Sequence, residues 1–177
     1  MISDWEYLEQ AKKGDEDAAD FLFDKYYKSL LRMTSLITGS IDSAKDIVQE
    51  TFVKLINGKI KHHEGKFKTY INTIAYRLAL KEKYRQKRNF SLFKIEKQIE
   101  SNSPLDSHIV NENQNNVFQV IQTLKPNYKE IMILRFYGKH SYEEISQITE
   151  IPLGTVKSRI FYAVKECGIR MKKKGML

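Results

Sequence analysis

The chain has 177 residues, of which 30 are Lys or Arg and 22 are Asp or Glu, giving a formal net charge of +8. This length suits one domain or two small ones, and the positive charge favours a polyanionic partner or surface. A single cysteine excludes an internal disulfide, and the absence of about 18 consecutive apolar residues excludes a predicted membrane span, so we expect a soluble, cytoplasmic protein.

Charge is distributed unevenly along the chain. Residues 1–58 carry 7 Lys or Arg against 11 Asp or Glu, residues 59–88 carry 10 against 2, and residues 89–177 carry 13 against 9. An acidic segment, a strongly basic segment and a mildly basic segment indicate separate surfaces for separate partners.

Two helices are predicted before residue 40. Trp5, Leu8 and Ala11 form a short apolar stripe at helical spacing. From Asp15 onward, apolar residues recur every three or four positions, which is the pattern of a long amphipathic helix, and Gly39 ends it. The members of this second stripe are Ala18, Leu22, Tyr26, Leu30, Met33 and Ile37.

A third helix is predicted from Asp42 to Ile56, with two contrasting faces. At about 100° per residue, its apolar side chains point one way and its acidic and amide side chains point nearly opposite. The apolar face has to join the core, so the polar face lies outward, either as a solvated surface or as a docking surface. The apolar face comprises Ala44, Ile47, Val48, Thr51 and Leu55, and the polar face comprises Asp42, Asp46, Gln49 and Glu50.

The loop after Gly58 contains His62, His63 and Glu64, which raises the question of a metal site. Adjacent histidines do not match the helical spacing of a zinc-binding HExxH motif, and no second group of ligands stands out. We therefore predict an ordinary polar loop, and we expect no metal and no cofactor.

A fourth helix is predicted from Lys66 to Arg88. Its buried stripe is predicted to consist of Phe67, Tyr70, Ile71, Ile74 and Leu78. Aromatic and hydrogen-bonding groups among cations suit a single nucleic-acid strand, because bases stack on rings and phosphates attract cations, although a solvated basic face fits as well. The residues predicted on or near the opposite face are Thr69, Asn72, Thr73, Tyr76, Lys83 and Lys87.

The remainder of the chain is also predicted to be helical. Residues 89–116 are rich in Ser and Asn with little apolar periodicity, which indicates a linker. No stretch alternates with a period of two, so the fold class is all-α: two small helical domains joined by a flexible linker. The second domain begins with a short helix at Val120, Ile121 and Leu124, followed by a helix from Tyr128 to Phe136 with Ile131, Leu134 and the aromatic rings inward and Gly138 as its C-cap.

The segment from Ser141 to Lys165 is predicted to be a helix-turn-helix. Ser141 and Glu144 form a capping box that starts its first helix, which buries Ile145 and Ile148. A short turn at residues 149–151 leads to Pro152 in the first turn of the second helix, which packs through Val156, Ile160, Ala163 and Val164. We expect this second helix to enter the major groove of DNA, with an ordinary helical hairpin and a solvated polar face as the alternative. Its polar face carries Thr155, Lys157, Ser158, Arg159 and Tyr162.

Three segments, in order and spacing, make the chain resemble a bacterial extracytoplasmic-function sigma factor. The sequence DSAKDIVQETFVKL (Asp42–Leu55) resembles the helix with which these factors bind the RNA polymerase clamp. The sequence FKTYINTIAYRLALKEKYRQKR (Phe67–Arg88) resembles their helix that reads and opens the minus-ten element. The segment Leu124–Ile160 resembles their domain that reads the minus-thirty-five element.

The resemblance implies a domain organisation and partners. Residues 1–88 would bind core RNA polymerase and the minus-ten element, 89–116 would be the linker, and 117–177 would read the minus-thirty-five element in duplex DNA. An anti-sigma factor is a further implied partner, and neither catalysis nor membrane insertion is expected. The implied polymerase-binding residues are Asp42, Asp46, Gln49 and Glu50, and the implied minus-ten residues are Lys66, Lys68, Asn72, Tyr76, Arg77 and Lys83.

The chain departs from the family pattern at several positions. Tyr70 stands where the family usually has Trp, and Tyr76-Arg77 stands where an Arg-Asn pair is common. Tyr162 and Val164 replace two arginines of the recognition helix. These departures predict unusual promoter sequences and weaker phosphate binding by the recognition helix.

Two other classes of protein remain as alternatives. A stand-alone helix-turn-helix transcriptional regulator would not need the acidic face of the third helix and would usually form a dimer. A nucleic-acid enzyme would have to use the loop at residues 62–64, which lacks a complete metal-ligand set.

Overall fold

The computed structural model describes residues 2–58, 65–93 and 119–175, and the secondary structure within these ranges is helical, as expected for an all-α protein. The chain forms two compact units, Met1–Ser103 and Pro104–Leu177. The predicted linker residues 94–116 and the loop residues 59–64 lie outside the described residues. Within the described part, no helix has both the length and the apolar character that a bilayer-crossing segment requires.

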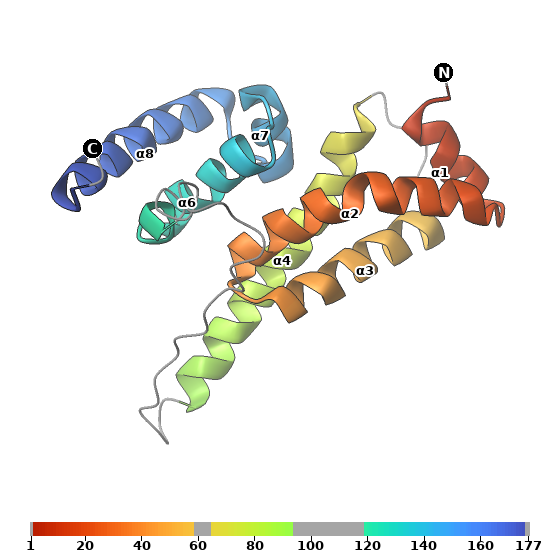
Figure 1. Cartoon of the computed structure of the whole chain (residues 1–177), viewed down its shortest axis with the longest axis horizontal. Helices are drawn as coiled ribbons and strands as arrows, with labels where there is room; N and C mark the ends of the chain where they lie inside the picture. Colours follow the sequence, from red (N-terminus) through yellow and green to blue (C-terminus); the bar gives the residue numbers. More distant parts are fainter. Residues whose placement is uncertain (1, 59–64, 94–118, 176–177) are drawn as a thin grey trace. The chain divides into compact units, whose positions relative to one another are not determined.

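The described part of the N-terminal unit contains four helices, and side-chain caps set the starts of α1, α2 and α3 (Figure 1). A capping box of Ser3 and Glu6 begins α1, while Asp15 accepts a hydrogen bond from the Ala18 N–H at the start of α2. Gly39 ends α2 with φ of 78°, a left-handed conformation that favours glycine. The helices are α1 (Asp4–Lys12), α2 (Glu16–Thr38), α3 (Ile41–Asn57) and α4 (Phe67–Phe93).

The cores of α1, α2 and α3 follow the predicted stripes. Every residue of the stripes predicted for α1 and α2 is buried, and so is the predicted apolar face of α3. The fully enclosed side chains Leu8, Leu22, Leu30 and Leu55 each stabilise the fold by about 1.5–3 kcal/mol relative to exposure. These three helices were predictable because each buries large apolar residues on one face.

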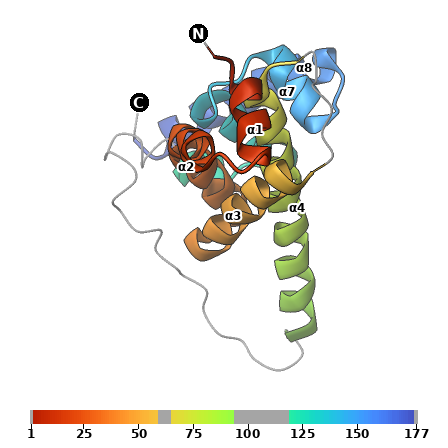
Figure 2. The ribbon, with the colours of Figure 1, turned by 90° about the vertical axis from the view of Figure 1, so that its right-hand side faces the viewer.

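The prediction for α4 was partly wrong. Phe67 and Ile71 are buried as predicted, but Tyr70, Ile74 and Leu78 are only half-buried. α4 packs against both α2 and α3, so its buried arc is wider than one stripe and includes polar side chains. The helix also continues to Phe93, beyond the predicted end at Arg88, and its later turns extend past α2 and α3 (Figure 2). The buried residues that the prediction placed elsewhere or omitted are Thr69, Asn72, Ala75, Tyr76 and Ala79.

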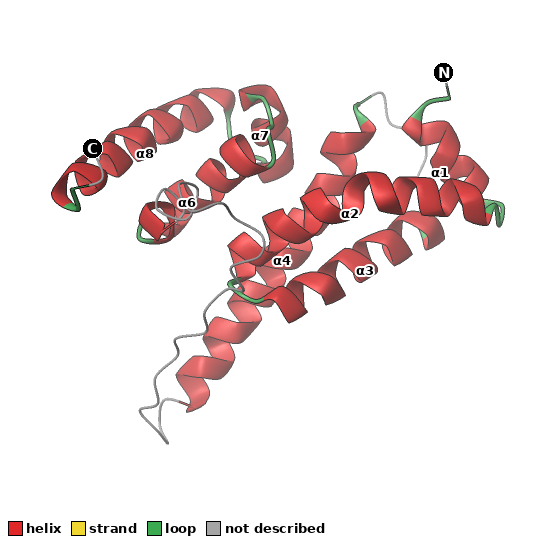
Figure 3. Ribbon diagram, viewed as in Figure 1, coloured by secondary structure: helices red, strands yellow, loops and turns green. Residues whose placement is uncertain are grey.

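In the described part of the C-terminal unit the secondary structure is again helical, and short loops and turns join the helices (Figure 3). Residues 119–122 form a short helical segment, and the π-helix η2 continues α6 directly. The core of the C-terminal unit contains predicted apolar residues, among them Val120, Ile121, Ile160 and Ala163. The bounded helices are α6 (Pro126–Met132), η2 (Ile133–Tyr137), α7 (Tyr142–Thr149) and α8 (Leu153–Lys173).

Two details around η2 differ from expectation. The side chain of Phe136 is 54% exposed rather than inward, because Ile133 and Leu134 fill the core side of this turn. Gly138 does end η2, but with φ of −79°, so it is not a left-handed cap. A Cβ atom there would lie 2.7 Å from the Leu134 carbonyl oxygen, so the backbone's close approach accounts for the glycine.

Candidate nucleic-acid and partner interfaces

The helix-turn-helix begins with the predicted capping box. The Ser141 hydroxyl accepts a hydrogen bond from the Glu144 N–H at 3.1 Å, and the Glu144 carboxylate accepts one from the Ser141 N–H at 2.9 Å. The turn after α7 contains Glu150 in a left-handed conformation, and the Ser146 hydroxyl donates to the Ile151 carbonyl at 2.6 Å. Pro152 is the N-cap of α8, so the second helix starts one residue later than predicted.

α8 packs through a narrow apolar seam. Val156, Ile160 and Ala163 are buried as predicted, whereas Val164 is 47% exposed and the prediction that it packs inward was wrong. At about 100° per residue, Val164 lies roughly 80° around the helix from Val156, while Cys167 lies within about 20°. Cys167 accordingly completes the seam, and burial raises the pKa of its thiol, as expected for a packing residue.

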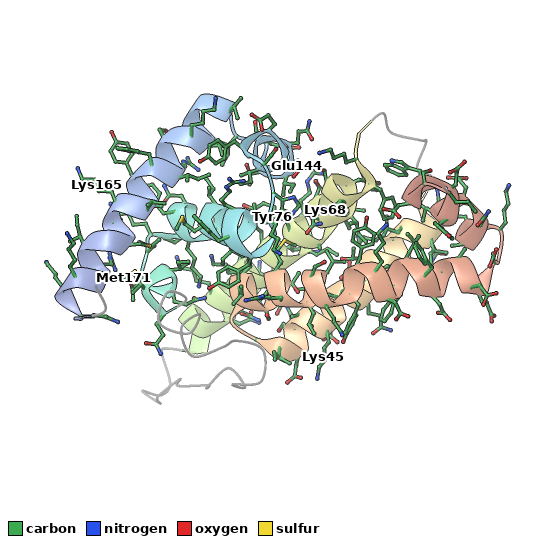
Figure 4. All side chains as sticks on the ribbon, turned by 45° about the horizontal axis from the view of Figure 1, so that its top comes forward. Lys45, Lys68, Tyr76, Glu144, Lys165 and Met171 are labelled. Carbon is green, nitrogen blue, oxygen red and sulfur yellow. The ribbon has the colours of Figure 1, made fainter. Side chains whose placement is uncertain are left out.

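The opposite face of α8 presents the predicted polar and cationic groups. Lys157, Ser158 and Tyr162 are exposed, and Thr155 and Arg159 are half-buried. Lys165, labelled in Figure 4, extends from the side of α8 that faces away from α6. One exposed ring on this face, that of Phe161, was not predicted. It is 64% exposed and meets the Tyr162 ring edge-on at 5.4 Å between centroids. The exposure of Phe161 could have been predicted, because it is next to Tyr162 in the sequence and lies away from the apolar seam of α8.

The polar face of α3 points outward as predicted. Asp42, Asp46, Gln49 and Glu50 are all exposed. Two same-helix ion pairs, Lys45–Asp42 at 3.6 Å and Lys54–Glu50 at 3.4 Å, lie on this surface. Exposed pairs of this kind contribute little stability, so their carboxylates remain available to a partner's cations.

A cleft of about 310 Å³ adjoins this acidic face, between α3 and α4. The sequence pattern does not reveal this cleft, because the cleft depends on how the two helices pack. Its α3 wall carries Asp46 and Glu50, its α4 wall carries cationic groups, and one apolar side chain of each helix also lines it. The Glu82 carboxylate on the α4 wall accepts two hydrogen bonds from the Arg85 guanidinium, which hold its pKa below the usual range. The lining residues are Ser43, Asp46, Ile47, Glu50, Leu78, Lys81, Glu82 and Arg85.

Two of the six predicted minus-ten residues are not at the surface of α4. Asn72 is 3% exposed and Tyr76 is 5% exposed, so placing them on the open face was wrong. The Asn72 amide donates to the Lys68 carbonyl within the same helix at 2.8 Å. The wide buried arc of α4 explains both errors. Lys66 and Arg77 are exposed as predicted, and Lys68 and Lys83 are half-buried.

The accessible face of α4 consists of a different set of residues, here termed the α4 strip. At about 100° per residue they fall within an arc of roughly 80°. Tyr84 is 65% exposed, and the half-buried Tyr70 has a pKa raised by burial and lowered in part by the charge of Arg77. Two rings are therefore interspersed with four cations along one side of the helix. The α4 strip comprises Lys66, Tyr70, Thr73, Arg77, Lys81, Tyr84 and Arg88.

The predicted polar loop at residues 62–64 lies outside the described residues. In residues 2–58, 65–93 and 119–175, no three His, Cys, Asp or Glu side chains come together in a way that could hold a metal ion.

A helix-turn-helix with a cationic second helix, in a chain with a separate helical unit, defines a DNA-binding protein of the helix-turn-helix class. Comparison with protein families narrows the class. Residues 22–89 match the model of Sigma-70 region 2, and residues 114–167 match the model of Sigma-70, region 4. The chain belongs to the sigma-70 family of transcription initiation factors, among its extracytoplasmic-function members, which confirms the family predicted from the sequence.

Relatives of known identity match nearly the whole chain. The ECF RNA polymerase sigma factor SigW of Bacillus subtilis (strain 168) is 29% identical over 165 residues, covering 86% of this chain and 88% of the relative. The ECF RNA polymerase sigma-E factor of Escherichia coli (strain K12) is 29% identical over 177 residues, covering 92% and 91%. These matches favour a sigma factor over a stand-alone regulator.

Two solved structures share the fold. One is CnrH in complex with the cytosolic domain of CnrY, with a TM-score of 0.67, 15% identity, and coverage of 94% of this chain and 96% of that one. The other is the sigma factor RpoE in complex with the anti-sigma factor NepR from Bartonella quintana, with a TM-score of 0.68, 20% identity, and coverage of 86% and 97%.

Proposed function

We propose that this chain binds core RNA polymerase and directs promoter-specific transcription initiation, without catalysing a reaction itself. The observation that carries the proposal is the presence of both sigma regions, in order, in one chain. Residues 1–88 would bind the polymerase and the minus-ten element, residues 89–116 would link the domains, and residues 117–177 would read the minus-thirty-five element. Such a protein would act in the cytoplasm, where the polymerase and the chromosome are.

In this proposal, α8 reads duplex DNA. Its exposed face offers hydroxyls at Thr155 and Ser158, cations at Lys157 and Arg159, and the ring and hydroxyl of Tyr162. Cations and hydroxyls bond both phosphates and base edges in the major groove, which can provide register and sequence discrimination. The seam on the other side of α8 buries only apolar residues, which leaves this face to the DNA.

The α4 strip captures the opened strand. Unstacked bases stack on aromatic rings while cations neutralise the phosphates, and the strip contains both kinds of group. Arg77, which replaces the family's common asparagine, lies in this strip beside Tyr70. Asn72 and Tyr76 would support the helix from inside rather than contact the strand.

The polymerase docks on the acidic face of α3. A partner arginine that reaches Asp46 and Glu50 would make charge-assisted bonds, with Gln49 bonding alongside. The adjoining cleft could enclose the aliphatic part of that side chain against Ile47 and Leu78. Because the two structural relatives were solved with partners named as an anti-sigma factor or a cytosolic domain, we include an anti-sigma partner in the proposal.

Charge reversal on α3 tests the docking surface. Asp46→Arg combined with Glu50→Arg should abolish capture by core polymerase while the thermal midpoint stays nearly unchanged, since both side chains are exposed. Asp20→Arg with Asp24→Arg is the matched control, because these residues are also exposed, acidic and four positions apart on α2. If the folded α3 variant captures core polymerase as strongly as the α2 variant does, the acidic face of α3 is not the docking surface.

Transcript sequencing tests the function as a whole. Core polymerase supplied with this chain and genomic DNA should start transcription at a limited set of sites that share two upstream elements. If the same sites are used without the chain, or if no start site depends on it, the proposed function is wrong.

A further inference from the structure

Trp5 connects α1 to the beginning of α4, although the two segments are far apart in the sequence. The side chain is 7% exposed, and its indole N–H donates a hydrogen bond to the Gly65 carbonyl at 2.9 Å. This bond holds the residue just before Lys66, where the α4 strip starts. Trp5 precedes residues 22–89, the part of the chain that matches Sigma-70 region 2.

The indole ring also contacts two aromatic rings in the first turn of α4. It meets Phe67 edge-on at 5.1 Å between centroids and lies against Tyr70 at 5.3 Å with the ring planes tilted by 47°. These separations are those of favourable aromatic pairs. One buried side chain therefore contacts the backbone before α4, the first core ring of α4 and the first ring of the α4 strip.

The helix that carries Trp5, α1, is attached to α2 by side-chain bonds, which fix the position of Trp5. The Tyr26 hydroxyl donates to the Asp4 carboxylate at 2.6 Å, and the Lys25 ammonium group pairs with the same carboxylate at 2.5 Å. Tyr26 in turn contacts Phe67 at 5.4 Å between ring centroids. The position of Tyr70 is thus set by a connected group of side chains from α1, α2 and α4.

We propose that Trp5 is a positioning residue for the capture of single-stranded promoter DNA, an inference that rests on the proposed function. It does not touch the strand, because it is buried. It keeps the Tyr70 ring and the adjacent Lys66 in the arrangement in which a base stacks and a phosphate is neutralised. Losing the indole would let the start of α4 and the Tyr70 ring move away from the strand.

Trp5 is the only tryptophan of the chain, which allows a direct spectroscopic test. Biosynthetic replacement by 5-hydroxytryptophan gives an emission that can be excited apart from the tryptophans of core polymerase. Adding the non-template single strand of a promoter found by transcript sequencing should change this emission, and Tyr70→Leu should remove most of the change. Adding the upstream duplex should leave it unaltered. A saturating single strand that leaves the emission unchanged would overturn the proposal.

Substitution separates positioning from general stability. In the holoenzyme, Trp5→Leu should weaken binding of that single strand at least about fivefold, with core binding and upstream duplex binding unchanged. Trp5→Phe keeps the ring contacts but loses the N–H donor, so it should show a smaller loss and also serves if Trp5→Leu does not fold. Tyr7→Leu is the matched control, because it breaks a stacked contact of α1 with Phe21, 4.1 Å between centroids, away from α4.

The outcomes distinguish the inference from the proposed function. If the wild-type chain directs initiation but Trp5→Leu and Trp5→Phe bind the strand as tightly as the wild type, the inference alone fails. Equal losses in Trp5→Leu and Tyr7→Leu would also overturn it, since they would reflect stability only. If no promoter depends on the wild-type chain, the proposed function fails first.

Discussion

The two helices proposed to touch DNA, α4 and α8, are built differently. α8 packs along one narrow seam that ends at Cys167, and its other side chains are exposed or half-buried. α4 packs against α2 and α3 together, which leaves a strip of roughly 80° accessible along the part of the helix that they cover, up to about Lys83. A helix that enters the major groove meets DNA on both sides, whereas a single strand can follow a strip. The two helices are therefore proposed to bind DNA differently, α8 as a duplex and α4 as a single strand, because they differ in how much of their surface is buried more than in how many cations they carry.

The sharpest test of this difference compares two tyrosines of α4. Tyr76→Ala should lower the free energy of unfolding by about 3–5 kcal/mol, because it removes a buried ring from a packed interior. Tyr84→Ala removes a ring that is 65% exposed and should leave the melting curve within error while weakening promoter opening. Thermal melts and a promoter-opening assay give the two readouts. The opposite pattern, with Tyr84 governing stability, would invalidate the description of α4.

The corresponding test on α8 concerns its cations. Lys157→Ala and Arg159→Ala should each weaken binding of the full chain to upstream duplex DNA, by about 1–3 kcal/mol if the contact is to a base. Lys172→Ala, an exposed cation in the last turn of α8, is the control and should have a much smaller effect. Titrations at several salt concentrations distinguish the kinds of contact, since losing one phosphate contact lowers the salt slope by about one. If both variants bind duplex DNA as tightly as the wild type, the proposal that α8 binds in the major groove is wrong.

The position of α8 depends on α7, because the two helices pack together. The capping box of Ser141 and Glu144 starts α7. Ser141→Ala should reduce the stability of the C-terminal unit by about 1 kcal/mol, because the Glu144 N–H loses its acceptor. Ser141→Thr keeps an acceptor oxygen and should behave nearly like the wild type. Circular dichroism melts would show the difference, and an unchanged midpoint for Ser141→Ala would mean that the cap is dispensable.

The smallest effect is expected at the α4 wall of the cleft. Hydrogen bonds from Arg85 lower the pKa of Glu82, so the ionised form is favoured in the folded state. A depressed pKa adds stability above the ordinary value of about 4.3, and this contribution is lost as the pH falls through the folded-state pKa. Glu82→Gln should therefore destabilise slightly at pH 7 and make no difference near pH 2. Melting curves of the wild type and the variant at both pH values check this pH dependence. If Glu82→Gln lost as much stability at pH 2 as at pH 7, the prediction would be wrong.

The sequence predicted helices well where large apolar residues form one stripe. Leu22, Leu30 and Ile37 on α2 are of this kind, and their burial needs no knowledge of the partner helices. α4 was partly mispredicted because its buried arc includes Ala75 and Ala79, whose small side chains carry little periodic signal, and because Asn72 satisfies its amide within the helix. The α3–α4 cleft and the Trp5–Gly65 bond join segments distant in the chain, so periodicity could not reveal them.

The π-helix η2 has a consequence for comparing chain lengths. The Gly138 N–H bonds to the Ile133 carbonyl at 3.0 Å, five residues back, where an α-helix would span four. A chain with one residue fewer between these positions could close the same turn as an α-helix and keep both flanking segments in place. Insertions and deletions among relatives are therefore expected to concentrate here, and an alignment that puts the gap elsewhere would misplace the residues of α7 by one position.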